Sequence, residues 1–203
     1  MSNHINAIVF DMGGVLLKTI DPKPREAMAL RFGTTRKELE STIFSSRSSH
    51  LSESGEISDQ DHWETVLQIF NQPAGDYLKI YDEYFSGDAI DEDLLNFAVS
   101  LKEDFCVGLL SNAWMNARIL LEERFHFIDK FDVSLFSYEA GSRKPDPNIY
   151  LKMVQMMGVK PENTLFIDDL PENVQGAISA GLQSIQYKNT PDLIENIEKI
   201  TER

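Results

Sequence analysis

Five short apolar segments constrain the fold of this chain more than any other feature of its sequence. They are residues 7–10, 105–110, 133–136, 164–167 and 183–187. From the second segment on, each is followed by a stretch whose apolar residues recur three and four positions apart, as in an amphipathic helix. Strands that alternate with helices of this length form βαβ units, whose strands run parallel. We therefore expect an α/β fold with a Rossmann-like, mainly parallel sheet and helices on both of its faces.

The stretch between the first two apolar segments differs from the rest because it shows helical signals only. Pro24 is placed to begin one helix, and Thr35 with Glu38 three residues later forms a capping box for the next. The serine-rich residues 45–52 are most simply a mobile loop between two helices. We therefore expect an α/β core with a small all-helical insert after its first strand. The core comprises residues 1–17 and 92–203, and the helical insert comprises residues 18–91.

Charge and cysteine content exclude several classes of protein. Lys and Arg number 19 and Asp and Glu 33, giving a formal net charge of −14, which argues against nucleic-acid partners and anionic membranes. A single cysteine, Cys106, rules out an internal disulfide framework and a cysteine-cluster zinc site. No apolar run approaches the ~20 residues of a membrane span, and residues 1–6 lack the pattern of a secretion signal. We expect a cytoplasmic monomer or small homo-oligomer.

Polar residues follow four of the predicted strands. In a parallel α/β sheet, ligands bind beyond the carboxyl ends of the strands. Asp11 follows the first strand, Ser111-Asn112 the second and Asp168-Asp169 the fourth, while Lys144 lies in the loop after the third. These side chains are therefore expected to meet at one edge of the sheet.

Each of these residues also fits a purely structural role. Asp11 could form a turn or cap a helix, Ser111-Asn112 could cap the next helix, and Lys144 could be a solvated charge. Asp168-Asp169 is harder to explain in this way, because adjacent carboxylates at the end of a buried strand repel each other unless a cation lies beside them. Mg²⁺, a hard cation that prefers oxygen ligands, would fill that role.

Taken together, four motifs resemble those of the haloacid dehalogenase-like superfamily of hydrolases, in particular its phosphatases with a helical cap. They are Asp11–Val15, Ser111-Asn112, Arg143–Pro147 and Phe166–Asp169, the last followed by Asn173. One such motif is a weak signal, but four in the same order are specific. The helical insert lies where that family has its small cap domain, so the resemblance covers essentially the whole chain.

The resemblance implies a phosphatase of small phosphorylated metabolites, such as sugar phosphates. Asp11 would attack phosphorus and form an aspartyl-phosphate. Mg²⁺ would be held by Asp11, the backbone carbonyl of Gly13 and Asp169, and it would lessen the repulsion between Asp11 and the phosphate. Asp168 would orient Lys144 or a metal-bound water, although the two adjacent carboxylates could exchange roles.

The remaining implied roles concern the phosphoryl group. Ser111 and the backbone of Asn112 would hold phosphoryl oxygens, and Lys144 would neutralise the charge that develops on them. The turn at Gly13 and Gly14 would let backbone N–H groups approach an anion.

Gly13 departs from the family pattern. In typical phosphatases of the family an Asp at this position protonates the leaving oxygen and then activates water. Three interpretations follow: a phosphatase with another acid or an undemanding leaving group, a 2-haloacid dehalogenase, or a protein that only binds a phosphorylated ligand. Asp168-Asp169 favours phosphoryl chemistry, because displacement at a carbon–halogen bond needs no metal.

Substrate choice is expected to lie in the helical insert, which could close over the site. Arg47 is the best candidate to reach an anionic substrate, because a basic side chain on a mobile loop has the necessary freedom. His50 and His62 are more simply surface residues, and Trp63 fits an apolar stripe in the core of the insert. Trp114, just after the second strand, either lines the pocket or packs beneath it.

Overall fold

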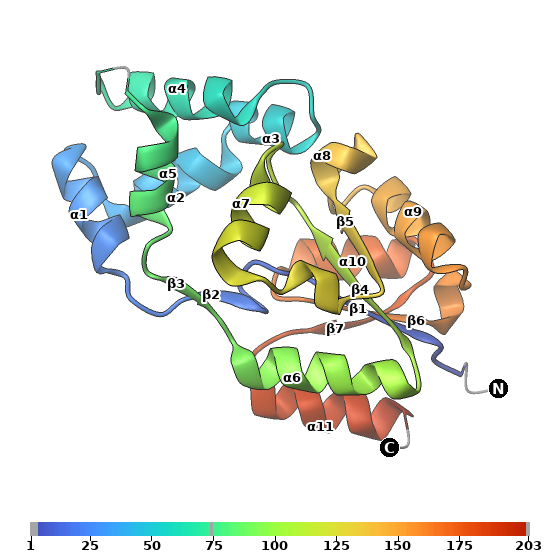
Figure 1. The fold of residues 1–203 in the computed structure, drawn as a ribbon. Helices are drawn as coiled ribbons and strands as arrows, with labels where there is room; N and C mark the ends of the chain where they lie inside the picture. Colours follow the sequence, from blue (N-terminus) through green and yellow to red (C-terminus); the bar gives the residue numbers. More distant parts are fainter. Residues whose placement is uncertain (1–3, 74, 202–203) are drawn as a thin grey trace.

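The computed structural model describes residues 4–73 and 75–201. Residues 1–3, on which the expectation about a secretion signal partly rests, lie outside the described residues. The centre of the fold is a five-stranded sheet in the order β5-β4-β1-β6-β7 (Figure 1). Its strands are β1 (Ala7–Phe10), β4 (Cys106–Ser111), β5 (Val133–Phe136), β6 (Thr164–Asp168) and β7 (Gln183–Gln186). All four pairings are parallel, so the expected fold class is confirmed.

Helices cover both faces of the sheet because β1, β4, β5 and β6 each place apolar side chains on the two faces. One face packs on α6 (Glu92–Ser100), α7 (Ala117–Phe125) and α11 (Thr190–Thr201), and the other on α9 (Pro147–Met157) and α10 (Pro171–Ser179). Four shorter helices join these elements: η1 (Leu101–Glu103), η2 (Ile128–Lys130), α8 (Ser137–Ala140) and η3 (Pro161–Asn163).

In the part of the helical insert that the structure describes, residues 18–73 and 75–91, there are five helices and, contrary to expectation, two short strands. The helices are α1 (Lys23–Arg31), α2 (Arg36–Ser45), α3 (Arg47–Glu53), α4 (Asp59–Ile69) and α5 (Tyr77–Tyr84). At its two ends, β2 (Leu17–Thr19) pairs antiparallel with β3 (Asp88–Ile90). The expectation of helical signals only was therefore wrong, because three-residue strands are too short to show an alternating pattern. The boundaries of a separate domain stay a prediction.

The serine-rich segment is mostly helix rather than loop. Ser46 caps α3, since its hydroxyl accepts a hydrogen bond from the backbone of Ser49 at 3.2 Å. Ser49 and Ser52 are buried, where small side chains let α3 pack against its neighbours. The prediction of a mobile loop was wrong because serine favours turns in isolation but also caps helices and fits crowded contacts.

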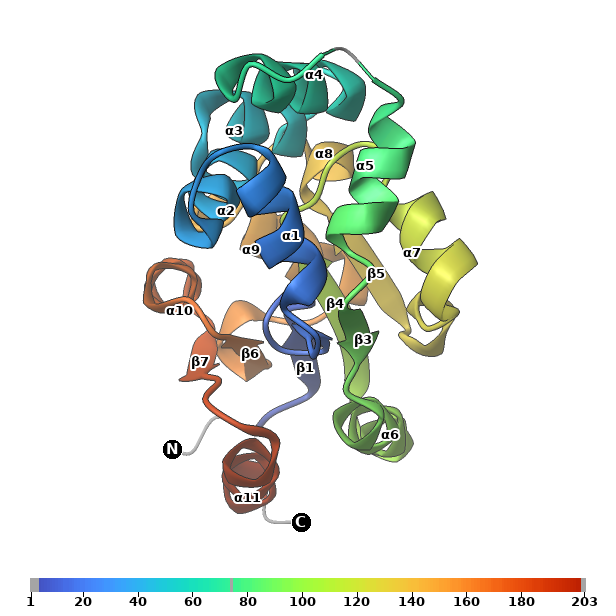
Figure 2. The same ribbon diagram turned by 90° about the vertical axis from the view of Figure 1, so that its left-hand side faces the viewer.

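A separate apolar cluster holds the insert together. Trp63 lies at its centre and is fully buried, as the sequence predicted. His62 is also buried, which corrects the expectation of a surface residue: its ring lies 4.9 Å from that of Trp114, and its Nδ1 is 3.0 Å from the Ser48 hydroxyl. Figure 2, a view turned by 90°, shows α1–α5 gathered beyond the ends of β1 and β4, so the insert covers one edge of the sheet.

Candidate active site

The predicted site residues lie at the carboxyl edge of the sheet. Phe10 at the end of β1 pairs with Leu109 of β4 and Ile167 of β6, so the residues that follow these positions are neighbours. The Asp11 backbone N–H continues the ladder by donating to the Ile167 carbonyl at 2.8 Å. Asp11, Ser111 and Asp168 are consequently brought together although they lie far apart in the sequence.

Lys144 is the buried cation of the site. Its Nζ lies 2.5 Å from Asp11 Oδ1 and 2.6 Å from Asp168 Oδ2, and it also donates to the Leu110 carbonyl at 3.2 Å. Only 1% of Lys144 is exposed. The ammonium group is therefore fixed between two carboxylates and cannot leave without stranding both of them.

Asn112 holds the backbone of Lys144 in place. Its side-chain amide donates to the Lys144 carbonyl at 3.0 Å and its amide oxygen accepts from the Lys144 N–H at 2.8 Å. The sequence pattern did not predict this use of the Asn112 side chain. Because the side chain of Asn112 is engaged with Lys144, the backbone N–H of Asn112 is the group of this residue that could hold a phosphoryl oxygen.

Both carboxylate oxygens of Asp168 are already engaged in hydrogen bonds. Its carboxylate accepts from the backbone of Leu170 at 2.9 Å, from Asn173 Nδ2 at 3.0 and 3.1 Å, and from Lys144. It is completely buried. Asn173, which the sequence motif includes without a role, thus helps to orient the carboxylate that orients Lys144.

Asp169 is placed quite differently from its neighbour. It is half-buried, and none of the side-chain hydrogen bonds found within residues 4–73 and 75–201 involves its carboxylate. The carboxylate packs on Gly14, where a Cβ atom would lie 2.5 Å from Asp169 Oδ2. Gly14 has a φ of +81° and donates its N–H to the Leu17 carbonyl at 2.9 Å, which forms the tight turn after Asp11. This turn gives Asp169 the room to face the cavity.

The charges of this cluster fit a divalent cation. Oxygen atoms of Asp11, Asp168 and Asp169 lie within 4.8 Å of one another, and Lys144 is the only cation between them in the described residues. Burial raises the pKa of Asp11 to about 7, against the effect of Lys144 and with that of the two other carboxylates. Burial and then Asp168 also raise the pKa of Asp169. An all-oxygen site with excess negative charge is what Mg²⁺ requires.

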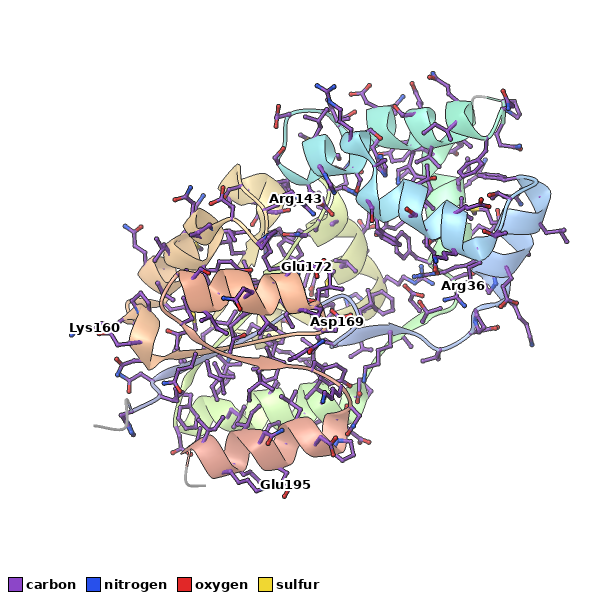
Figure 3. The ribbon with its side chains drawn as sticks, turned by 180° about the vertical axis from the view of Figure 1, so that it is seen from behind. Arg36, Arg143, Lys160, Asp169, Glu172 and Glu195 are labelled. Carbon is purple, nitrogen blue, oxygen red and sulfur yellow. The ribbon has the colours of Figure 1, made fainter. Side chains whose placement is uncertain are left out.

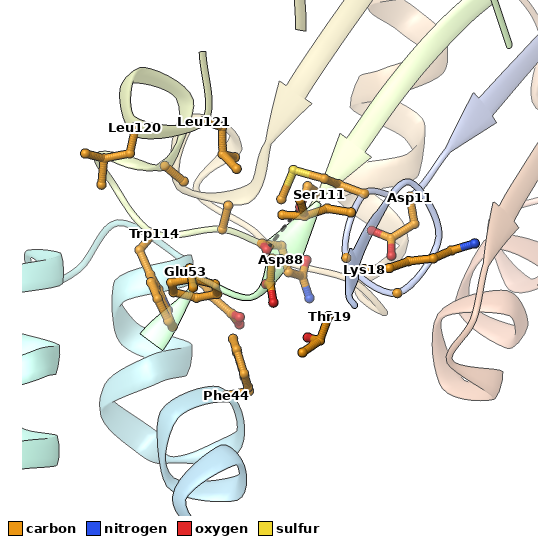
Figure 4. A pocket seen from close by; sticks show the side chains of 18 of the residues that line it. Asp11, Lys18, Thr19, Phe44, Glu53, Asp88, Ser111, Trp114, Leu120 and Leu121 are labelled. Carbon is orange, nitrogen blue, oxygen red and sulfur yellow. Dashed lines mark hydrogen bonds between the residues drawn. The ribbon is translucent and has the colours of Figure 1, made fainter. Parts of the chain in front are cut away.

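These residues open into a cavity of about 1210 Å³ between the core and the helical insert. Asp11, Gly13, Ser111-Asn112, Lys144 and Asp169 line its inner end. Figure 4 shows Asp11 on one side of the cavity and Trp114, Leu120 and Leu121 on the other. Trp114 therefore lines the cavity and also packs in the apolar cluster of the insert.

Arg47 is not brought to this cavity. It lies exposed on α3 and lines a separate hollow of about 330 Å³, which it shares with His50 and Arg143. Because residues 47–53 form α3 and not the expected loop, the Arg47 side chain is held at the separate hollow and not at the cavity that contains Asp11. His50 lines both hollows.

Glu53 is a residue of the site that the sequence did not point to. It ends α3, is buried, lines the large cavity and accepts a hydrogen bond from Arg143 Nε at 2.6 Å. Burial raises the pKa of Glu53, against the effect of Arg143. Figure 3 shows Arg143 and Asp169 between the core and the insert, whereas Lys160 and Glu195 lie far from it. The Glu53–Arg143 pair joins the insert to the loop that carries Lys144.

Comparison with known families agrees with this geometry. The model of the haloacid dehalogenase-like hydrolases matches residues 5–181. The chain belongs to this family. It is therefore a hydrolase, and the resemblance of its four motifs is confirmed. None of the helices in residues 4–73 and 75–201 has the length and apolar character that a membrane span requires.

Several haloacid dehalogenase-like proteins are similar over most of the chain. A D-ribitol-5-phosphate phosphatase of Bacteroides thetaiotaomicron is 25% identical over 208 residues, covering 93% of this chain and 94% of the relative. The solved structure of a predicted family hydrolase from Porphyromonas gingivalis is 28% identical, covers 98% of both chains and has a TM-score of 0.77. A family enzyme from Bacteroides thetaiotaomicron, solved with magnesium and inorganic phosphate, is 24% identical over 91% of this chain and 94% of that one, with a TM-score of 0.75.

Other relatives are longer proteins. The bifunctional epoxide hydrolase 2 of Sus scrofa is 28% identical over 131 residues, which are 60% of this chain but 23% of the relative. The flavin mononucleotide hydrolase 1 of Arabidopsis thaliana is 32% identical over 100 residues, 48% of this chain and 40% of the relative. The chain thus spans less than half the length of these two relatives.

Proposed function

We propose that the protein is a Mg²⁺-dependent phosphatase that hydrolyses a small phosphorylated metabolite through an aspartyl-phosphate on Asp11. The contrast between Asp168 and Asp169 carries the proposal. One carboxylate is fully engaged and holds Lys144, and its neighbour is free to face the cavity beside Asp11. A phosphatase and a magnesium-and-phosphate complex among the similar proteins support it.

Asp11, the carbonyl of Gly13 and Asp169 would hold the Mg²⁺ ion. Bound there, the ion would screen the repulsion between the Asp11 carboxylate and a phosphate dianion. Asp168 is less suited to bind the ion directly, because all its accepting positions are directed at Leu170, Asn173 and Lys144. This favours Asp168 as the residue that orients Lys144.

The reaction would proceed in two displacements at phosphorus. An oxygen of Asp11 forms a bond to phosphorus while the ester P–O bond breaks, and its electron pair leaves with the alcohol oxygen. Lys144, Ser111 and the Asn112 N–H stabilise the charge on the phosphoryl oxygens. The oxygen of a water molecule then forms a bond to phosphorus as the bond between phosphorus and Asp11 breaks. Its electron pair returns to the Asp11 carboxylate, a proton of the water passes to solvent, and inorganic phosphate leaves.

We further infer that residues 18–91 act as a cap domain over this site. The chain enters and leaves the insert through β2 and β3, which pair with each other in a sheet separate from the five-stranded one, and this two-stranded ribbon suits a hinge. Closure would exclude water from Asp11 during the first displacement. The Glu53–Arg143 pair would hold the closed position.

The other two interpretations of Gly13 remain as alternatives to be tested. A dehalogenase would have no use for the acidic cluster at Asp168-Asp169. A binding protein would have no use for a nucleophile whose orientation is fixed by Lys144 at 2.5 Å. The phosphatase accounts for both features.

The Asp11→Asn variant tests this proposal, because it keeps the shape of the side chain and removes the nucleophile. We expect Mg²⁺-dependent phosphate release from a panel of phosphomonoesters to fall by at least ~10³-fold, with the melting temperature kept or raised. Asp129→Asn, at an exposed aspartate that does not line the cavity, is the matched control and should keep full activity. The panel is run with Mg²⁺, with chelator, and with 2-haloacids.

Three results would contradict the proposal. Phosphate release by Asp11→Asn at the wild-type rate would exclude Asp11 as the nucleophile. Metal-independent halide release from 2-haloacids would identify a dehalogenase instead. Tight binding of phosphorylated compounds without turnover would identify a binding protein.

A further inference from the structure

We propose, resting on the phosphatase function above, that the substrate is the phosphomonoester of an aromatic alcohol with an apolar skeleton rather than a polyol or sugar phosphate. Three features of the cavity lead to this: the apolar side chains of its far wall, the pairing of its buried charges, and the open space beside Gly13.

The far wall of the cavity combines partly covered apolar side chains with three exposed charged residues, Asp82, Glu123 and Arg124. Phe44 and Leu78 line it, yet 36% and 41% of these residues are exposed. Leu120, Phe125 and Phe85 line it as well and are half-buried. Apolar side chains left uncovered inside a cavity are a common mark of a ligand site, because a bound apolar group removes them from water. This wall is continuous with the end that holds Asp11.

Aromatic rings form the centre of this wall. Phe44 of α2 stacks on Trp114 with ring centres 5.8 Å apart and planes 9° apart. Phe85 completes the group, with its ring centre 6.2 Å from that of Phe44 and 6.3 Å from that of Trp114. Trp114 comes from the core and the other two rings from the insert, so the wall forms when the insert lies against the core. Only 6% of Trp114 is exposed, so Phe44 and the half-buried Phe85 present the surface of this group, which favours a flat, apolar ligand.

The buried charged side chains of the lining are engaged with one another. Arg25 binds Asp88 at 2.7 Å, and Arg143 binds Glu53 at 2.6 Å. The atoms of the first pair that lack partners, Arg25 Nε and Asp88 Oδ1, are shielded from solvent. A polyol needs several accessible donors and acceptors to replace the water around its hydroxyl groups. The two ion pairs therefore offer a polyol little, and the other polar side chains of the lining, among them the half-buried Thr19 and the exposed Ser45 and His50, are less enclosed.

The space beside Gly13 concerns the leaving group. A Cβ atom at Gly13 would have no other atom within 4 Å, and Gly13 has no side chain that could act as an acid. An alkoxide must be protonated as it leaves, whereas an aromatic alkoxide delocalises the electron pair of the broken P–O bond and departs without help. After release it takes a proton from water. An aromatic alcohol therefore suits a site without an acid at this position.

The test compares kcat and KM for phenyl, 1-naphthyl, glycerol and ribitol phosphates with the full chain and Mg²⁺, from inorganic phosphate release. We expect 1-naphthyl phosphate to exceed the polyol phosphates at least ~100-fold in kcat/KM, and its KM to lie below that of phenyl phosphate. Phe44→Ser and Leu78→Ser should each raise KM for 1-naphthyl phosphate ~10-fold with little change in kcat. Ile69→Ser, an exposed apolar residue of α4 outside the lining, is the control and should leave KM unchanged.

Gly13→Asp tests the leaving-group argument separately. The open space accepts a side chain, so this variant should raise kcat for ribitol phosphate ~10-fold or more and change that for 1-naphthyl phosphate less. Equal or better turnover of the polyol phosphates by the wild type would overturn this inference and leave the phosphatase function standing. Unchanged KM in both Phe44→Ser and Leu78→Ser would also overturn it. Failure of every ester to react would overturn the phosphatase function itself.

Discussion

Gly14 determines where the Asp169 carboxylate can lie. In Gly14→Ala the new Cβ would be 2.5 Å from Asp169 Oδ2, and φ of +81° is strained for any residue with a side chain. We expect unfolding free energy to fall by about 1–2 kcal/mol and the Mg²⁺ concentration for half-maximal activity to rise ~10-fold or more, measured by urea unfolding and a metal titration. The neighbouring Gly13→Ala is the control, since its Cβ meets nothing within 4 Å. Equal effects of the two variants would contradict this role of Gly14.

The sequence predicted which residues form the site better than it predicted the hydrogen bonds between them. Asp11, Ser111 and Asp168-Asp169 could be proposed because each follows an apolar strand, and the strands had to end at one edge. The bonds of Asn112 to the backbone of Lys144, across 32 positions, and of Glu53 to Arg143, across 90, depend on loop paths that no local pattern encodes. Their proposed roles in catalysis stay predictions until measured.

The packing of α4 makes stability depend on pH through His62. Burial lowers the pKa of His62 from 6.5 to about 4, opposed in part by the Ile43 carbonyl. Below about pH 6.5 His62 therefore binds a proton in the unfolded chain but not in the folded chain. The contribution of neutral His62 to the unfolding free energy is fully present above that pH and is lost as the pH falls towards 4. We expect this residue alone to remove about 2 kcal/mol of unfolding free energy between about pH 7.5 and pH 5.

Urea unfolding of His62→Phe at these two pH values tests this expectation. The variant keeps an aromatic ring against Trp114 and cannot be protonated, so its stability should fall less with pH than that of the wild type. His4→Gln, a change at an exposed histidine, should behave as the wild type does. The same pH dependence in His62→Phe would assign the loss to other groups.

The contact of α3 with the core should affect catalysis rather than stability. Glu53 and Arg143 are joined at 2.6 Å across the cavity wall, whereas Arg118 and Glu139, also 2.6 Å apart, join α7 and α8 within the core. In double-mutant cycles, Glu53→Gln with Arg143→Gln should show coupling of about 1–2 kcal/mol in kcat/KM. The cycle of Arg118→Gln with Glu139→Gln should show coupling in unfolding free energy only. Coupling in kcat/KM for the second pair alone would refute the proposed closure contact.

The same elements show what an isolated sequence can predict. The strands of the sheet lie within one residue of their expected ends, because a buried strand is a continuous apolar run with polar neighbours. β2 and β3 exist only through their pairing, Leu17 with Ile90 and Thr19 with Asp88, which no local pattern predicts. α3 escaped prediction since its serines act as a cap at Ser46 and as small buried residues at Ser49 and Ser52.

The whole molecule repels anions, which makes the local field of the site decisive. The net charge of −14 opposes the approach of a phosphate ester, and the clustered Asp11, Asp168 and Asp169 add to this near the cavity. Lys144 offsets one of these charges and a divalent cation would offset the rest. The acidic composition thus excludes non-specific anion binding and makes the proposed substrate binding conditional on the metal.

This condition predicts a thermal shift that depends on Asp169. Mg²⁺ at about 100 times its dissociation constant should stabilise the wild type by about 2.7 kcal/mol, or roughly 5–10 °C in melting temperature for a chain of this size. Asp169→Asn should melt higher than the wild type without metal, because it removes the repulsion from Asp168, and should show no shift with Mg²⁺. Glu195→Gln, an exposed acid on α11, should shift as the wild type does, and NaCl of equal ionic strength should not reproduce the shift. A full Mg²⁺-induced shift in Asp169→Asn would mean that the ion binds elsewhere. If the shift is lost in Asp169→Asn and kept in Glu195→Gln, the stabilisation depends on the Asp169 carboxylate and not on the net charge of the molecule.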